Sequence, residues 1–83
     1  MTTTTITTEE TVPARYRVGQ HVRLVHEQKA WNDRHEPGLI PAGELVDIVE
    51  VKWISMLKRW YYRINFLNLN EWVLGDEIVE AMP

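Results

Sequence analysis

The stretch RWYYRINFL, residues 59–67, decides the fold class of this chain. Two series of side chains alternate along it, one mostly apolar and one mostly polar: Trp60, Tyr62, Ile64 and Phe66 against Arg59, Tyr61, Arg63 and Asn65. Successive side chains of a β-strand point to opposite faces of a sheet, so a period of two predicts a strand. We expect the Trp60 series to face the core and the Arg59 series to face outward.

Strand signals continue on both sides of this stretch. Four further segments are expected to pair with it: YRVGQHVRLVH (16–26), ELVDIVEVKWI (44–54), EWVL (71–74) and DEIVEA (76–81), the last as a strand or a short helical turn. In 44–54 the apolar period slips near residue 49, which predicts a β-bulge or a strong bend. A tight turn is expected at 68–70, and Trp60 and Trp72 are expected to pack in the core or half in it.

The remaining segments are predicted to lack regular structure. Residues 27–43 are polar and contain Pro37-Gly38 and Pro41, which favour a long loop. Seven of the first eleven residues are Thr, so residues 1–13 are expected to form a flexible tail before a domain at 14–83. Five short strands with a long first loop predict an all-β domain, a small SH3-like barrel. An OB-fold is the rival, but it usually needs a helix that 52–59 is too short to form.

Composition excludes several classes of function. The chain has 83 residues, a net charge of −3 and no Cys, so disulfides, thiolate metal sites and cysteine nucleophiles are excluded within it. No apolar run approaches the roughly 20 residues of a membrane span. The polar, acidic start does not resemble a secretory signal, and we expect a cytoplasmic protein without membrane insertion. The charges are clustered along the sequence: no acidic residue lies between Lys52, Lys58, Arg59 and Arg63.

Several motifs together suggest a relationship. YRVGQHVRL (16–24), AGELVDIVEVKW (42–53), YYRINF (61–66) and LGDEIVEA (74–81) resemble successive strands of the SH3-like electron-transport accessory proteins. That superfamily includes the variable subunit of ferredoxin–thioredoxin reductase, the photosystem I subunit PsaE, the NdhS subunit and the nitrile hydratase β-chain barrel. The segment His35-Glu36-Pro37 falls where the reductase chain has a loop with His and Pro. Residues 54–58, ISMLK, depart from the reductase pattern.

The resemblance implies a non-catalytic accessory subunit that binds a larger protein and carries no cofactor. The larger protein would be a redox enzyme or photosynthetic electron-transfer complex, with an acidic ferredoxin as a second partner. Aromatic and cationic side chains outside the predicted core are the candidate partner-binding residues: Trp31, His35, Trp53, Lys58, Arg59, Tyr61 and Arg63. Cations beside aromatic rings suit an acidic protein surface.

Three alternatives stay open at this point. The same cations, with Tyr61 stacking on bases, would suit a small nucleic-acid-binding barrel. A groove beside the 27–42 loop would suit an adaptor for extended peptides. An exposed tryptophan surface would also suit a homodimer.

Catalysis and metal binding find no support in the residue pattern. His21, His26 and His35 are spaced by five and nine residues, which lacks the local pairing of a structural metal site. His35 beside Asp33 and Glu36 lacks an accompanying nucleophile, and the four glycines are scattered singles rather than a phosphate-binding loop. We therefore predict no catalytic residues, no metal site and no enzymatic activity of this chain alone.

Overall fold

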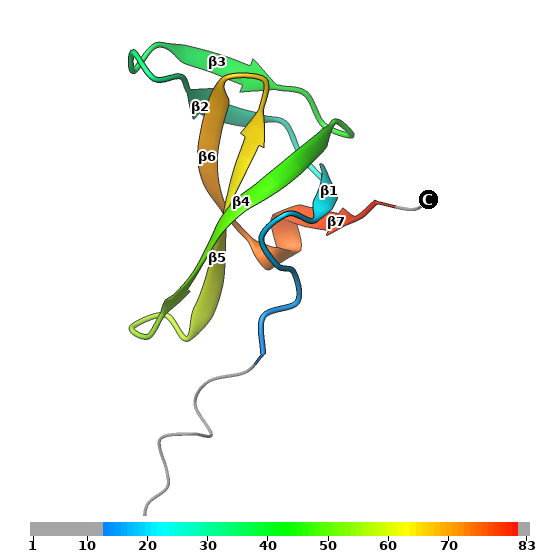
Figure 1. Cartoon of the computed structure of the whole chain (residues 1–83), viewed down its shortest axis with the longest axis vertical. Helices are drawn as coiled ribbons and strands as arrows, with labels where there is room; N and C mark the ends of the chain where they lie inside the picture. Colours follow the sequence, from blue (N-terminus) through cyan, green and yellow to red (C-terminus); the bar gives the residue numbers. More distant parts are fainter. Residues whose placement is uncertain (1–12, 82–83) are drawn as a thin grey trace, which may run out of the picture.

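The protein is a single curled antiparallel sheet, described by a computed structural model that covers residues 13–81 (Figure 1). Seven strands lie in the order β3-β2-β6-β5-β4-β1-β7. Their bounds are β1 His21–Leu24, β2 Gln28–Trp31, β3 Pro37–Ile40, β4 Leu45–Ile54, β5 Arg59–Phe66, β6 Leu69–Leu74 and β7 Ile78–Glu80. The fold class is therefore all-β, as the alternating stretches predict.

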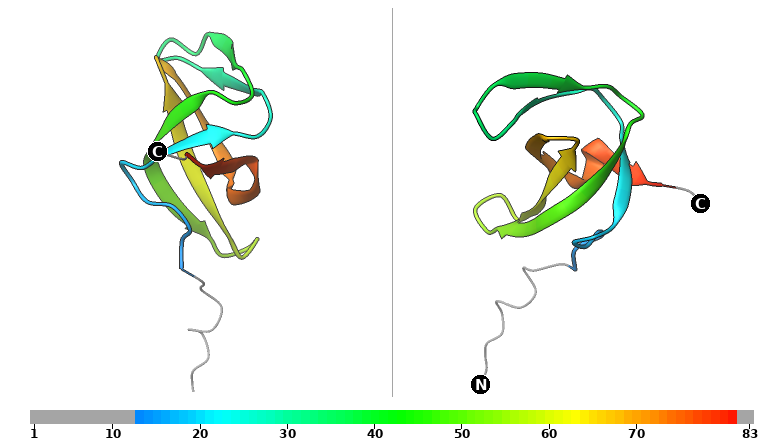
Figure 2. Two further views of the ribbon diagram at one scale, coloured as in Figure 1. Left: turned by 90° about the vertical axis from the view of Figure 1, so that its right-hand side faces the viewer. Right: turned by 45° about the horizontal axis from the view of Figure 1, so that its top comes forward.

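The long strand β4 bends the sheet into half a barrel. Its start pairs with β1 over residues 45–47, and its remainder pairs with β5 from Asp47 to Ile54. The register shifts between Ile48 and Glu50, so the bulge predicted near residue 49 is confirmed. A bulge increases local twist and lets one strand serve two parts of a sheet. Figure 2 shows the resulting curl of the sheet.

The core fills the concave side of the sheet. Its members come from all seven strands and the segment before β1: Tyr16, Val22, Leu24, Ala30, Ile40, Val46, Ile48, Tyr62, Ile64, Val73 and Ile78. Tyr62 and Ile64 are buried, and Trp60 and Phe66 pack partly against this cluster. The inward series predicted for residues 59–67 is therefore confirmed.

The prediction of a long polar loop at residues 27–43 was wrong, because residues 28–40 form a hairpin of two strands. β2 pairs with β3 from Gln28–Ile40 to Trp31–Pro37, and Trp31 also pairs with Asn70 of β6. Each strand has four residues and buries only one side chain fully, Ala30 or Ile40, so the apolar signal is weak. Pro37 suits β3 because β3 lies at an edge of the sheet, where a missing N–H costs no ladder bond. Together with the five expected strands, the two strands of this hairpin give the sheet its seven strands.

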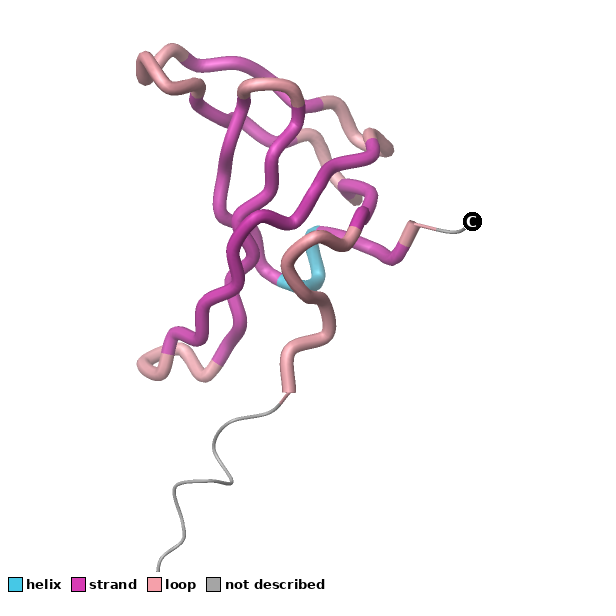
Figure 3. The backbone as a smooth tube through the Cα atoms, in the orientation of Figure 1, coloured by secondary structure: helices cyan, strands magenta, loops and turns pink. Residues whose placement is uncertain are grey.

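Smaller differences concern turns and ends. The predicted turn at 68–70 lies at 67–68, and Leu69 and Asn70 belong to β6. Within the predicted segment 16–26 the strand itself is β1, and a turn at 18–19 precedes it, with Gly19 at a positive φ of 94°. The closing segment combines both forms expected of it, a 3-10 turn at Gly75–Glu77 followed by β7, and Figure 3 shows this turn as the helical element of the described chain. The predicted tail, apart from Pro13, falls outside the described residues.

Candidate functional site

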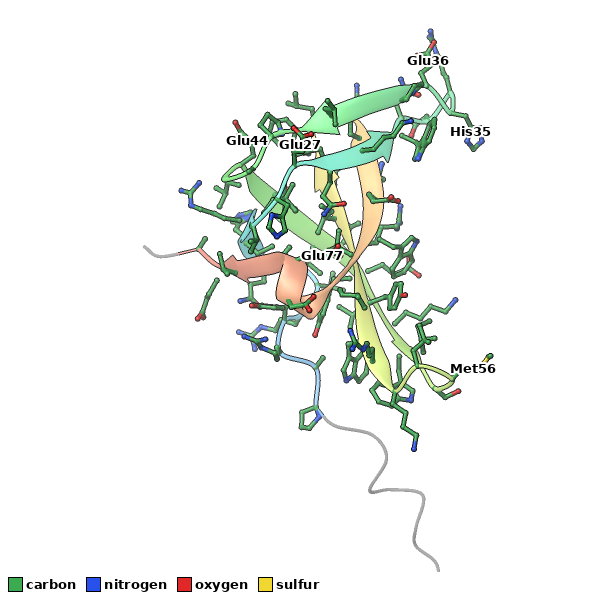
Figure 4. All side chains as sticks on the ribbon, turned by 180° about the vertical axis from the view of Figure 1, so that it is seen from behind. Glu27, His35, Glu36, Glu44, Met56 and Glu77 are labelled. Carbon is green, nitrogen blue, oxygen red and sulfur yellow. The ribbon has the colours of Figure 1, made fainter. Side chains whose placement is uncertain are left out.

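One end of the molecule is a projecting hairpin, here called the arm and defined as residues 51–62. It consists of the far ends of β4 and β5 and the turn at 55–58. The side chain of Met56 at its tip is 93% exposed and that of Leu57 is 53% exposed. Figures 1 and 4 show this tip at the opposite end of the sheet from the β2–β3 turn. The arm therefore offers an apolar tip that no other described element covers.

An aromatic pair stiffens one face of the arm. Trp53 and Trp60 are cross-strand partners, and their ring centroids lie 5.4 Å apart at an interplanar angle of 59°. Both side chains are half-buried, and Trp60 also packs against the core. Such a pair contributes about 0.5–1.5 kcal/mol beyond the area that it buries. The pair links the two strands of the arm at the edge of the main core.

The other face of the arm carries cations. Lys52 lies opposite Tyr61, and Ile54 lies opposite Arg59, so these side chains share the outer face of the sheet. Lys58 is in the turn, with a positive φ of 54°. Residues 51–70 contain no acidic residue, so the arm is positively charged along its length.

A second feature of the outer face is an open hollow of about 350 Å³ between the β2–β3 turn and strands β5 and β6, here called the groove. Its lining combines two tryptophans with charged and amide side chains: Trp31, Asn32, Asp33, His35, Arg63, Asn70, Glu71 and Trp72. Trp72 lies opposite Arg63 across the β5–β6 ladder, and Asn70 lies opposite Trp31. The sheet register therefore assembles the groove from residues up to 41 positions apart in the chain.

The turn beside the groove is held by one side chain. Asn32 Oδ1 accepts hydrogen bonds from the backbone N–H groups of Arg34 and Glu36, each at 2.9 Å. Its Nδ2 donates to Glu36 Oε1 at 2.8 Å, while the backbone N–H of His35 donates to the carbonyl of Asn32. His35 has a positive φ of 61°, and Figure 4 shows its ring projecting away from the strands. These hydrogen bonds fix the conformation of the turn from within the chain itself.

The guanidinium in the groove is already engaged. Arg63 Nε lies 3.0 Å from Glu50 Oε1, and one terminal nitrogen lies 3.5 Å from the Asn70 side-chain oxygen. The Arg63 and Glu50 side chains are 38% and 50% exposed, so this ion pair contributes about 0–1 kcal/mol to stability. Its larger effect is to neutralise a cation that would otherwise add to the charge of the arm.

The structure separates the seven predicted partner-binding residues into two groups. Trp31, His35 and Arg63 line the groove, whereas Trp53, Lys58, Arg59 and Tyr61 belong to the arm. Arg59 also borders a smaller apolar hollow of about 170 Å³, together with Trp60, Leu74 and Gly75. The predicted outer face of Arg59, Tyr61 and Arg63 is therefore present, but its two ends differ in charge.

Sequence reasoning missed part of the groove. The half-burial of Trp72 agrees with the core or half-core packing predicted for it, but its place opposite Arg63 in the groove was not predicted, and its neighbour Val73 is the buried residue. Asp33 and Glu71 were not predicted to belong to one site. In EWVL (71–74) three apolar residues follow one another, so the strand alone leaves its inward parity open. Pairing with β5 settles this parity, because the alternating β5 places its inward residue Tyr62 opposite Val73 and its outward residue Arg63 opposite Trp72.

Within residues 13–81 no group of three or more His, Asp or Glu side chains is arranged to hold a metal ion. The same part of the chain contains no helix long and apolar enough to cross a membrane. Compared with known protein families, curated proteins and solved structures, the sequence matches none of them. What the chain does must therefore be argued from the arm and the groove.

Proposed function

We propose that this protein is a non-catalytic docking subunit built on an SH3-like barrel. The proposed barrel consists of β1, β4, β5, β6 and β7, with the 3-10 turn before the last strand. The β2–β3 hairpin then occupies the long first connection of that barrel. Support for this interpretation comes from the strand order, the curl of the sheet and the continuous core on its concave side.

The observation that carries the proposal is the composition of the arm. Exposed Met56 and Leu57 stand at its tip, with an aromatic pair behind them and cations around them. Aromatic side chains, methionine and arginine are enriched at protein interfaces, and this composition supports an interaction site at the tip. The arm would act by positioning and electrostatic steering rather than by chemistry.

The charge of the arm specifies the partner chemistry. Lys52, Lys58 and Arg59 favour an acidic surface on a larger protein. By the resemblance of residues 16–81 to electron-transport accessory proteins, we propose a redox enzyme complex or an acidic ferredoxin as that protein. Nucleic acid suits the face less well, because Glu50 neutralises Arg63 and two carboxylates line the neighbouring groove.

The proposal is tested by affinity purification of the tagged full chain from its source organism, with nuclease present. The test variants are Met56→Asn at the tip and Lys52→Glu with Arg59→Glu on the arm. Arg63→Glu is avoided because it would place a second acid beside Glu50. We expect one stoichiometric protein partner with the native chain, reduced at least ten-fold with either variant.

The matched control is Arg17→Glu with Arg23→Glu, which reverses two exposed cations outside both the arm and the groove. We expect the control to retain the partner. Equal capture by arm and control variants contradicts docking through the arm. Loss of all copurifying proteins on nuclease treatment moves the function to nucleic-acid binding, because phosphate contacts would then carry the association.

A further inference from the structure

The two ends of the outer face carry opposite charge. The arm has Lys52, Lys58 and Arg59 and lies in a stretch without acids. The groove has the carboxylates of Asp33 and Glu71, while its own guanidinium, that of Arg63, is held by Glu50. Asp33 makes no hydrogen bond or ion pair within the part of the chain that the structure describes. The groove is therefore a separate acidic site, not an extension of the basic arm.

The aromatic side chains of the groove suit a cation as well. Trp31 is 40% exposed and lines the groove together with Trp72. The ring of Trp31 already attracts one ammonium group, since Lys29 Nζ lies 5.4 Å from its centroid. A cation over an indole face is attracted by the ring quadrupole, and nearby carboxylates add a charge-assisted hydrogen bond. Indoles and carboxylates in one open hollow thus select a positive side chain.

We propose that the groove receives an arginine side chain of the docked partner protein. A guanidinium is planar, so it can stack on an indole while its edge donates to the Asp33 or Glu71 carboxylate. This inference rests on the proposed docking function and names a second contact in it. One contact places an acidic patch of the partner on the arm, and the other places a basic side chain in the groove. Two contacts of opposite sign fix the orientation of the partner, because the reversed arrangement brings like charges together.

The first experiment uses a small probe and the full chain. N-acetyl-arginine N-methylamide is titrated into the isotope-labelled protein, and backbone and indole N–H shifts are followed by NMR. The control probe is the citrulline analogue, which has nearly the same shape without the charge. We expect saturable shifts at Trp31, Trp72 and residues 32–35, with a Kd on the order of 1–10 mM. Equal shifts with both probes, or shifts confined to other residues, overturn the proposal.

The second experiment removes the two carboxylate charges of the groove and keeps side chains of the same size. Asp33→Asn with Glu71→Gln should weaken arginine binding at least five-fold, and Asp33→Asn alone should weaken it at least two-fold. The Glu71→Gln substitution keeps a side-chain oxygen that can accept the hydrogen bond that the Trp72 backbone N–H donates to Glu71. The matched control, Glu27→Gln with Glu80→Gln, removes two exposed acids that do not line the groove, and it should leave binding unchanged. A groove variant that binds as tightly as the control variant overturns the proposal.

The outcomes separate this inference from the docking function itself. Loss of partner capture in the arm variants together with no response to the arginine probe removes the groove contact and leaves the arm as the docking element. A selective arginine response without any effect of the arm variants removes the arm from the mechanism and leaves the groove as a cation site. Binding of the probe to the native chain but equally to the Asp33 and Glu71 variant contradicts the proposed site.

Discussion

Tyr16 and Tyr62 meet edge to face, with ring centroids 5.4 Å apart and an interplanar angle of 77°. This contact attaches the segment before β1 to the central strand β5. Two hydrogen bonds extend the attachment: the Tyr62 hydroxyl accepts from the Arg15 backbone N–H at 3.0 Å, and the Tyr16 hydroxyl donates to the Ile78 carbonyl at 3.4 Å. The rings therefore tie together both ends of the domain across the core.

The first prediction concerns this tyrosine pair. Tyr62→Phe keeps the ring but leaves the Arg15 N–H without its acceptor, so unfolding should become easier by about 1 kcal/mol. Tyr16→Ala removes a ring that is 6% exposed and should cost about 3–5 kcal/mol. Urea denaturation measures both. A Tyr16→Ala protein within about 1 kcal/mol of the native chain would show that the segment before β1 is not part of the cooperative core.

The second prediction concerns Leu67, the first residue of the turn between β5 and β6. Leu67 has a positive φ of 58° and is 78% exposed, so it holds a conformation disfavoured for side chains with a Cβ and gains little from burial. Leu67→Gly should raise the free energy of unfolding by about 0.5–1 kcal/mol and the Tm by about 3–6 °C. Calorimetry measures the change.

Met56→Gly is the control for Leu67→Gly. Met56 is even more exposed and does not have a positive φ, so glycine relieves no strain there and only adds freedom to the unfolded chain. It should leave stability unchanged or lower it. A similar gain from both substitutions would show that the left-handed backbone at Leu67 is not the cause.

The third prediction concerns the packing of the β2–β3 hairpin on β6. A Cβ at Gly38 would lie 2.9 Å and 3.0 Å from the two terminal carbons of Leu69. Gly38→Ala should therefore lower stability by about 1 kcal/mol, because the end of the Leu69 side chain, which packs against the core, must move. Leu69→Val removes those carbons, so the same alanine should cost at least about 0.5 kcal/mol less in that background. Purely additive effects in this double-mutant cycle would show that contact with Leu69 is not what makes the alanine destabilising.

The fourth prediction concerns the stiffness of the arm. Trp53→Ala removes the ring contact with Trp60 but leaves the main core, to which Trp53 does not belong. Amide hydrogen exchange should accelerate within residues 51–62, while exchange at the core positions Ile64 and Val73 changes little. Lys52→Ala, on the outer face of the same arm, serves as the control and should leave exchange unchanged. Uniform acceleration throughout the sheet would show that the arm and the core open together.

The alternation in residues 59–67 and the slip of the apolar period near residue 49 were sufficient to predict an all-β chain with a bulged β4. Both are local signals, because side-chain parity along one strand depends only on the pleat. The parity also placed Arg59, Tyr61 and Arg63 on the outer face before any pairing was known. The predicted candidates Trp31, His35 and Arg63 do meet, but only in the folded chain.

Tertiary structure decided what local signals could not. β2 and β3 each fully bury a single residue, so they become strands through pairing with each other and with Asn70. Trp72 faces outward because its strand pairs with β5 in a register that places Val73 opposite the buried Tyr62. The groove follows from these two pairings, since they bring Asp33 and Glu71 into one hollow. Cross-strand register is a long-range property, and a short strand with little apolar contrast contains no local pattern that specifies it.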